Sequence, residues 1–156
     1  VKGLAWSLNK PVVGVSSLDA LAWQCSPGSL LVCALLDARK HEVYCCCYRH
    51  QDGELKKSGT EQVATPADAI GDIREPCLFI GNGALLYKKE IVAKLGTLAH
   101  FSGWNQDNIR ASSVAGLSLS CFNHQKTDDA VSLVPQYIRK SDAEIHRRTK
   151  DNLLKS

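Results

Sequence analysis

Hydrophobic residues in this chain fall into short blocks that alternate between helical and extended spacing. Residues 1–8 carry apolar side chains at helical spacing and stop before Pro11, whose ring forces the preceding residue out of the helical region. Residues 11–15 form a mostly β-branched run that predicts a buried strand. The serine pair at 16–17 then supplies caps for a helix over residues 18–23. The pattern therefore predicts helix, strand and helix in succession.

The next part of the chain predicts an antiparallel meander. Residues 30–36 are continuously apolar, residues 37–41 interrupt them with charge, and residues 42–48 return to β-favouring side chains. This order is typical of a hairpin with a charged tip. A second turn at 51–54 then places a third antiparallel strand over residues 55–63.

The second half of the chain returns to alternating helices and strands. A Thr-Pro pair at 65–66 predicts the start of a short helix. Residues 77–80 predict a buried strand that runs into a glycine turn at 81–83, followed by a helix over residues 85–95. A last helix is expected over residues 111–124. One α/β domain with helices against a sheet accounts for this order.

Composition narrows the class of protein without specifying an activity. The 156 residues have a net charge of +3, and 22% are charged, as in ordinary globular proteins. No apolar stretch approaches the roughly 20 residues that span a bilayer, and no secretory leader opens the chain, so we expect a cytoplasmic protein without membrane contact. A solvated helix or tail, rather than an RNA contact, is favoured for the basic cluster of Arg139, Lys140, Arg147, Arg148 and Lys150.

The seven cysteines and five histidines do not have the spacing of a metal site. Three consecutive cysteines at 45–47 alternate faces in a strand and cannot converge on one ion, and neither C-x-x-C nor H-x-x-x-H occurs. We expect reduced thiols, several of them acting as small core hydrophobes, with no metal and no cofactor. The wide separation of Trp6, Trp23 and Trp104 favours core packing over a base-stacking platform.

Two features could carry chemistry. Gly81, Asn82 and Gly83 follow a buried strand and could let a nucleotide approach the backbone, although a plain strand-to-helix turn explains them as well. Asp37 also ends a buried strand and could face a metal or phosphate, or could be a structural residue of the hairpin tip that pairs with Arg39. No G-x-G-x-x-G, Walker lysine or G-x-S-x-G elbow accompanies them.

Five motifs follow one another in an order that resembles the TsaB (YeaZ) family over nearly the whole chain. They are KGLA at 2–5, PVVGVSSLDALA at 11–22, DAR with EVY at 37–44, GNGA at 81–84 and PQYIR at 135–139. The resemblance implies an actin/Hsp70-like (ASKHA, ribonuclease H-like) α/β lobe with a mixed sheet flanked by helices. It also implies a role in tRNA N6-threonylcarbamoyladenosine modification.

The same resemblance implies a non-catalytic scaffold and a division of the chain. The protein would pair with a TsaD-type subunit and work with a TsaE-type ATPase, and it would meet tRNA only indirectly, through the complex. A homodimer is a further option. Residues 1–10 would be the remnant of an N-terminal-lobe helix, residues 11–139 the C-terminal lobe, and residues 140–156 a polar helix or tail. Most of the N-terminal lobe would then lie outside this sequence. The expected partner interface is formed by Lys2, Leu4, Ala5 and Leu8.

The resemblance also marks nucleotide-facing positions. Actin-like folds present an acidic turn to phosphate and a glycine pair to adenosine, and the matching positions here are Asp37, Arg39, Gly81, Asn82 and Gly83. Ala38 adds a Cβ where glycine is wanted, so the implied site is degraded. Two other interpretations stay open: a nucleotide-dependent phosphotransferase or ATPase of the same fold, and a self-associating module with exposed apolar surface. A glycoprotease-like activity is disfavoured because H-x-x-x-H is absent.

Overall fold

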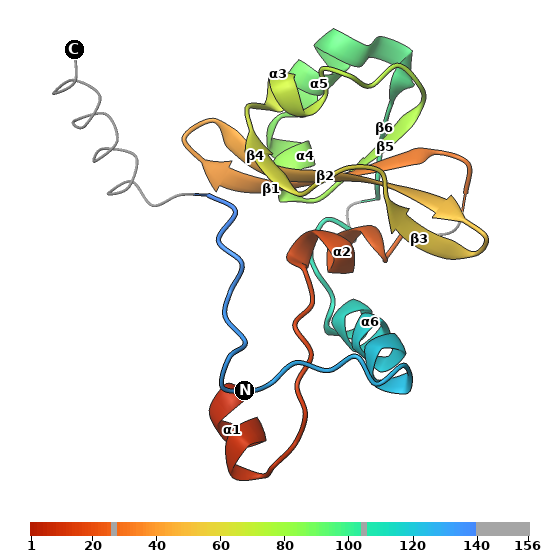
Figure 1. The fold of residues 1–156 in the computed structure, drawn as a ribbon. Helices are drawn as coiled ribbons and strands as arrows, with labels where there is room; N and C mark the ends of the chain where they lie inside the picture. Colours follow the sequence, from red (N-terminus) through yellow and green to blue (C-terminus); the bar gives the residue numbers. More distant parts are fainter. Residues whose placement is uncertain (26–27, 104–105, 140–156) are drawn as a thin grey trace, which may run out of the picture.

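A six-stranded mixed sheet forms the centre of the computed structural model, which describes residues 1–25, 28–103 and 106–139 (Figure 1). The strand order is β3-β2-β1-β5-β6, and β4 pairs with the other end of β2. The strands are β1 (Leu31–Arg39), β2 (Glu42–Gln51), β3 (Glu54–Lys57), β4 (Gln62–Ala64), β5 (Cys77–Ile80) and β6 (Ala99–Phe101). Strands β1 to β4 pair antiparallel, whereas β1, β5 and β6 are parallel.

Helices cover both faces of this sheet. They are α1 (Lys2–Ser7), α2 (Ser17–Ala22), α3 (Pro66–Ala69), α4 (Asn82–Leu86), α5 (Lys88–Leu95) and α6 (Ala111–Asn123), with a 3-10 turn at Gly96–Leu98. Figure 1 shows α3, α4 and α5 on one face and α2 on the other, with α6 beyond it. Within the described parts of the chain, no helix combines the length and the apolar character needed to cross a bilayer.

The predicted hairpin is confirmed, and the strand expected after it is divided. β1 and β2 turn at a charged tip in which Arg39, Lys40 and His41 all have positive φ. The strand predicted over 55–63 is two strands, β3 and β4. Between them, the three residues 59–61 lie opposite a single residue of β2, Cys46, so they form a bulge in the pairing. Such a bulge bends the strand and redirects its side chains.

Two other expectations needed correction, and one strand was missed. Residues 11–15 are extended but do not form a strand. Val12 makes an isolated bridge to Asp128, and the backbone N–H of Gly14 then bonds the Asp128 side chain instead of continuing a backbone ladder. The helix predicted over 85–95 starts earlier, at Asn82, and is interrupted at Tyr87. Strand β6 was not predicted, since its three residues are too few to show a period.

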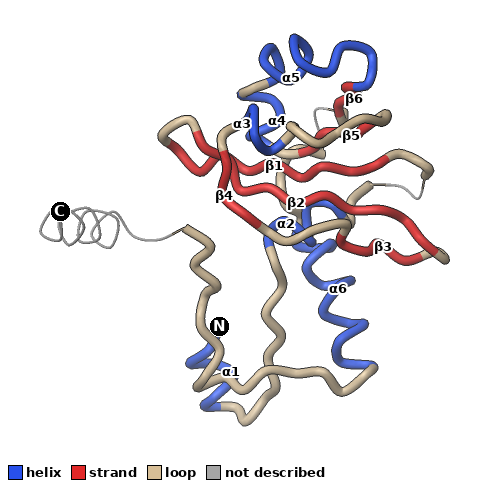
Figure 2. Tube along the Cα trace, turned by 45° about the horizontal axis from the view of Figure 1, so that its top comes forward, coloured by secondary structure: helices blue, strands red, loops and turns tan. Residues whose placement is uncertain are grey.

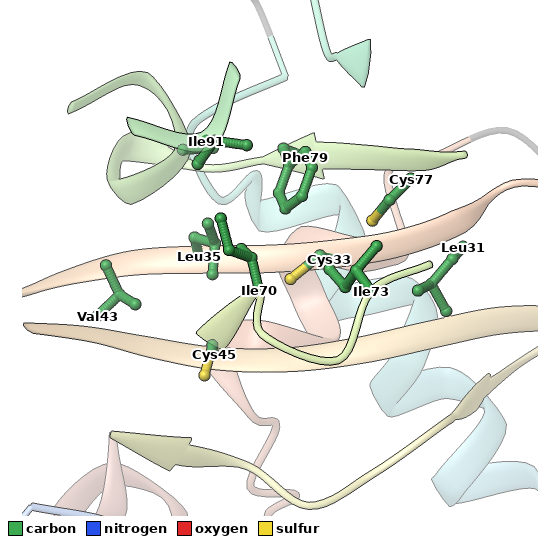
Figure 3. Close-up of a cluster of buried hydrophobic side chains, with 11 residues drawn as sticks. Leu31, Cys33, Leu35, Val43, Cys45, Ile70, Ile73, Cys77, Phe79 and Ile91 are labelled. Carbon is green, nitrogen blue, oxygen red and sulfur yellow. The ribbon is translucent and has the colours of Figure 1, made fainter. Parts of the chain in front are cut away.

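Two apolar clusters occupy the two faces of the sheet. The first lies beneath α3, α4 and α5 and includes Leu35, Phe79 and Ile91 (Figure 3). The second lies beneath α2 and includes Leu21 and Tyr48. As predicted, the cysteines at 45–47 alternate, with Cys45 and Cys47 on the first face and Cys46 on the second.

The prediction that the tryptophans pack in the core is wrong for the two that are described. Trp6 is 72% exposed on a helix of only six residues, which cannot bury more than one side of itself. Trp23 is 44% exposed, and its ring lies close to Gly116 of α6, where a Cβ would come within 2.7 Å of it. Trp104 lies outside the described residues.

Candidate functional site

A cleft of about 880 Å³ lies where the carboxyl ends of β1 and β5 meet the start of α2 and the C-terminal segment, residues 133–139. We call it the polar cleft. Its polar lining includes Ser16, Asp37, Tyr44, Glu61, Asn82 and Arg139. Clefts at the carboxyl ends of sheet strands are the common location of ligand sites in α/β proteins. The polar cleft is therefore the candidate ligand site of this chain.

Asp37 and Asn82 line the cleft together, and Arg39 contacts Asp37 without being part of the lining. The backbone N–H of Asp37 donates to Asn82 Oδ1 at 3.0 Å. The carboxylate of Asp37 accepts the backbone N–H of Arg39 at 2.9 Å and lies 3.5 Å from the Arg39 guanidinium, which is largely exposed. These bonds link the end of β1 to the start of α4 and hold the turn at the hairpin tip.

The two glycines of the Gly-Asn-Gly turn lie against the neighbouring strand. Gly81 has φ +106°, and a Cβ there would stand 2.3 Å from the carbonyl oxygen of Leu35. A Cβ at Gly83 would lie 3.0 Å from the same carbonyl. Asn82 lines the cleft, but neither glycine does. The two glycines therefore let the turn pack closely against β1. This agrees with the interpretation of these residues as a plain strand-to-helix turn.

Asp107 supports this turn, although no motif in the sequence pointed to it. Its Oδ1 accepts the backbone N–H of Gly81 at 3.1 Å and the Ser102 hydroxyl at 2.7 Å. The residue is 4% exposed, and its Oδ2 is buried with no hydrogen-bond partner among the described residues. Because Asp107 lies 26 residues after Gly81, no local motif could connect the two.

Residues 128–139, which include the C-terminal segment, are held against the rest of the molecule by polar contacts of Lys2, Gly14 and Arg139. The Lys2 ammonium donates to the carbonyls of Val131 and Leu133. The N–H of Gly14 donates to Asp128 Oδ2 at 2.7 Å. Figure 2 shows the chain leaving α6, passing beside the segment between α1 and α2, and rising again toward the sheet.

Arg139 makes a further contact, at the hairpin tip. Its guanidinium donates to the Ala38 carbonyl at 2.6 Å and lies 3.3 Å from the Glu42 carboxylate. A guanidinium can satisfy both partners at once because its five donors lie in one plane. Arg139 thus closes the polar cleft on the side of the β1–β2 turn.

A charged network extends from Glu61, which lines the cleft, to Lys57, Asp19 and Tyr48 behind it. The Tyr48 hydroxyl donates to Asp19 at 2.7 Å, and the Lys57 ammonium lies 3.0 Å from Asp19 and 2.6 Å from Glu61. Burial, and then the bond to Asp19, raises the pKa of Tyr48. Partial burial opposes ionisation of Glu61, but hydrogen bonds from Lys57 and Ser16 outweigh it and lower the Glu61 pKa. The bulge at 59–61 is what brings Glu61 here.

The four expected interface residues have different environments. Leu4 and Leu8 are 69% and 64% exposed, whereas Ala5 is buried and the Lys2 ammonium is engaged by residues 131 and 133. In the described parts of the chain, no group of three or more histidine, cysteine, aspartate or glutamate residues could hold a metal ion. The basic cluster beyond Arg139 lies outside the described residues.

Comparisons with known proteins support the family that the order of motifs predicted. Residues 1–147 match the family described as TsaD: tRNA N6-adenosine threonylcarbamoyltransferase. The chain is 34% identical over 146 residues to the tRNA threonylcarbamoyladenosine biosynthesis protein TsaB of Bacillus subtilis (strain 168), which confirms the resemblance to TsaB (YeaZ). The match covers 92% of this chain and 62% of that protein, so the chain spans less than two thirds of this relative.

Solved structures give the same answer for the fold. One is an uncharacterised Pseudomonas aeruginosa protein with similarity to peptidase YEAZ, at TM-score 0.72 and 27% identity, covering 89% of this chain and 64% of that one. Another is YeaZ from Pseudomonas aeruginosa, at TM-score 0.67 and 27% identity, covering 87% and 63%. With the mixed sheet flanked by helices, these matches confirm the predicted actin/Hsp70-like fold class.

Proposed function

This chain belongs to the TsaD: tRNA N6-adenosine threonylcarbamoyltransferase family, and from that premise we propose that it acts in tRNA threonylcarbamoyladenosine biosynthesis as a non-catalytic scaffold. The identity with TsaB over 92% of the chain supports this role. Because the chain spans only 62% of that relative, the activity and partners of a whole TsaB are part of the proposal. A role on tRNA would place the protein in the cytoplasm.

The proposed partners are a TsaD-type subunit, which would carry the catalysis, and a TsaE-type ATPase. In this arrangement tRNA meets the chain only through the complex, and a homodimer would compete for the same apolar surface. The interface would include the exposed side of α1, where Leu4 and Leu8 are seven-tenths and nearly two-thirds exposed. Lys2 would contribute by fixing α1 to residues 131–133, and Ala5 by its small buried side chain.

The observation that supports this interface best is the exposed apolar side of a helix that is itself anchored. Neighbouring exposed apolar side chains are typical of surfaces that bind a partner. The contacts of Lys2 hold α1 in place. The side chains are thus presented by a fixed element rather than by a loose end.

Reconstitution tests the proposal. The full-length protein is combined with TsaD-type and TsaE-type partners, and incorporation of the threonylcarbamoyl group into tRNA is measured. We expect Leu4→Asp to reduce both co-purification with the TsaD-type subunit and modification, while Leu86→Asp, at another exposed leucine on α4, leaves both unchanged. Full modification without the protein would contradict the scaffold role.

A second candidate function is nucleotide binding at the polar cleft, with or without phosphotransfer. The position of Asp37, Arg39 and Asn82 at the carboxyl ends of β1 and β5 favours it. The packing of Gly81 and Gly83 against Leu35 speaks for a structural use of the glycines instead. Calorimetry with ATP and Mg²⁺ separates the two: tight binding that Asn82→Ala abolishes would favour the nucleotide site, and no binding would exclude it.

A further inference from the structure

Cys33 and Cys47 are directly opposite each other in the centre of the sheet. They are register partners across the antiparallel β1–β2 pair, and both contribute to the apolar cluster beneath α3, α4 and α5. Cys77 of β5 belongs to the same cluster, and the Cys33 thiol hydrogen-bonds with both Cys47 and Cys77. Figure 3 shows the Cys33 and Cys77 sulfurs in this layer.

The backbone geometry places this pair in the closer of the two antiparallel arrangements. The carbonyl of Cys47 accepts the N–H of Ser58, so the polar backbone groups of Cys47 face β3 rather than β1. Cys33 and Cys47 are therefore a non-hydrogen-bonded pair, in which opposite Cα atoms are about 4.5 Å apart. That separation lies within the range of roughly 4.4–6.8 Å that a disulfide requires.

Only one of the two thiols is accessible from outside. A pocket of about 430 Å³ opens beside Cys47, and its lining includes Arg49, Ser58 and Glu75 but not Cys33. Cys47 is partly exposed, whereas Cys33 is fully buried. A small reagent can therefore reach Cys47 first, and Cys33 can react only afterwards.

The surroundings make Cys47 the better nucleophile. The hydrogen bond from Cys33, and then the Arg49 charge, lowers the pKa of Cys47 despite its partial burial. Donating that bond is the main reason that the pKa of Cys33 is raised. By contrast, burial raises the pKa of Cys45 to about 11. The thiolate is the reactive form of cysteine, so Cys47 is set apart from its neighbours.

The charge around the pocket indicates which reagent would enter. Among the described residues, its lining has three acidic side chains, Asp68, Asp72 and Glu75, and one basic side chain, Arg49, which forms an ion pair with Glu75. A net negative lining attracts cations and repels anions. A disulfide with ammonium groups is therefore favoured over one with carboxylates.

We propose that Cys47 is a thiolation site for small cationic disulfides and that Cys33 resolves the product into a Cys33–Cys47 disulfide. The Cys47 thiolate attacks one sulfur of the reagent, which forms a mixed disulfide and releases one thiolate. The Cys33 sulfur then attacks Cys47, and the departing second thiolate takes the Cys33 proton and leaves as a thiol. In balance, two protein thiols are oxidised and one small disulfide is reduced to two thiols.

The test treats the reduced full chain with cystamine, a cationic disulfide, or with dithiodiglycolate, an anionic one. Acid quenching and peptide mass mapping then locate the modified cysteines. We expect cystamine to give a Cys33–Cys47 disulfide, with Cys47 reacting about tenfold faster than Cys121, a half-buried thiol on α6 that serves as the internal control. Dithiodiglycolate should react more slowly at Cys47, and added salt should reduce the difference.

Two variants separate the steps. Cys33→Ser should stop the reaction at the mixed disulfide on Cys47, and Cys47→Ser should leave Cys33 reduced. Should either variant fail to fold, the time course in the unaltered chain still decides, because the mixed disulfide must appear at Cys47 before the internal disulfide forms. Equal rates at Cys47 and Cys121, faster reaction with the anionic reagent, or first modification at Cys33 would overturn the proposal.

Discussion

Gly81, the residue between β5 and α4, has no room for a side chain. Its φ of +106° disfavours every L side chain, and a Cβ would stand 2.3 Å from the Leu35 carbonyl oxygen. We expect Gly81→Ala to lower the free energy of unfolding by about 2–4 kcal/mol, measured by urea denaturation.

Gly59→Ala is the matched control, because nothing lies within 4 Å of a Cβ there and its φ is not in the positive region. This change should alter stability by no more than about 0.5 kcal/mol. Equal effects of the two substitutions would show that the close approach of Gly81 to β1 is not what requires glycine.

Glu61 predicts an acid-sensitive contribution to stability. Its pKa is lowered in the folded state, so its contribution is fully present above the unfolded value of about 4.3 and is lost as pH falls through the folded pKa. Urea titrations below about pH 5 should therefore show a decline that Glu61→Gln makes shallower. Glu54→Gln, at an exposed position on β3, should leave the decline unchanged. The same slope in both variants would contradict this account.

At the scale of elements, α2 depends on its first hydrogen bonds. The Ser16 side chain accepts the backbone N–H groups of Leu18 and Asp19 and also bonds Glu61. Ser16→Ala should cost about 1 kcal/mol of stability, measured by thermal or urea unfolding. Ser17→Ala, one residue inside the helix, should cost less. The reverse order would show that Ser17 is the functional cap.

Strand β2 shows why element predictions succeeded unevenly. Its ten residues alternate between two buried faces, and the predicted hairpin with β1 followed from that run and from the charge between the strands. The division of the next strand could not be predicted, because the bulge at 59–61 exists only in relation to Cys46 on the partner strand. A single-chain pattern does not contain that register.

At the scale of the whole molecule, Arg139 joins two parts of the chain that are 101 residues apart. Its guanidinium contacts Ala38 and Glu42 at the edge of the polar cleft. Arg139→Ala should loosen residues 128–139, which include the C-terminal segment, and this would be seen there as faster hydrogen exchange and faster proteolysis with little change in the sheet.

Arg39→Ala is the control for this experiment, since Arg39 is on the same hairpin tip and its side chain is mostly exposed. It should leave exchange in residues 128–139 unchanged. Glu42→Gln should produce a partial effect, because the carbonyl of Ala38 still accepts from Arg139. Unchanged exchange in Arg139→Ala would mean that the contacts of Lys2 and Asp128 suffice to hold the segment.

The sequence alone determined the features that depend on neighbours along the chain. Apolar runs and turn residues predicted β1, β2 and β5, the Ser16 and Thr65 caps predicted the starts of α2 and α3, and the order of motifs predicted the family and the fold class. Backbone periods, caps and turns are local, so they can be found in a single sequence.

Tertiary structure alone decided what each candidate residue contacts. It placed Asn82 beside Asp37, turned Gly81 and Gly83 toward Leu35, and added Asp107, which no motif marked. Within the described residues it also gave residues 11–15 no pairing beyond the isolated bridge of Val12 to Asp128, although their β-branched side chains favour a strand. A strand needs a neighbour, and a site needs groups from several elements, so both depend on distances in space that spacing in the sequence does not contain.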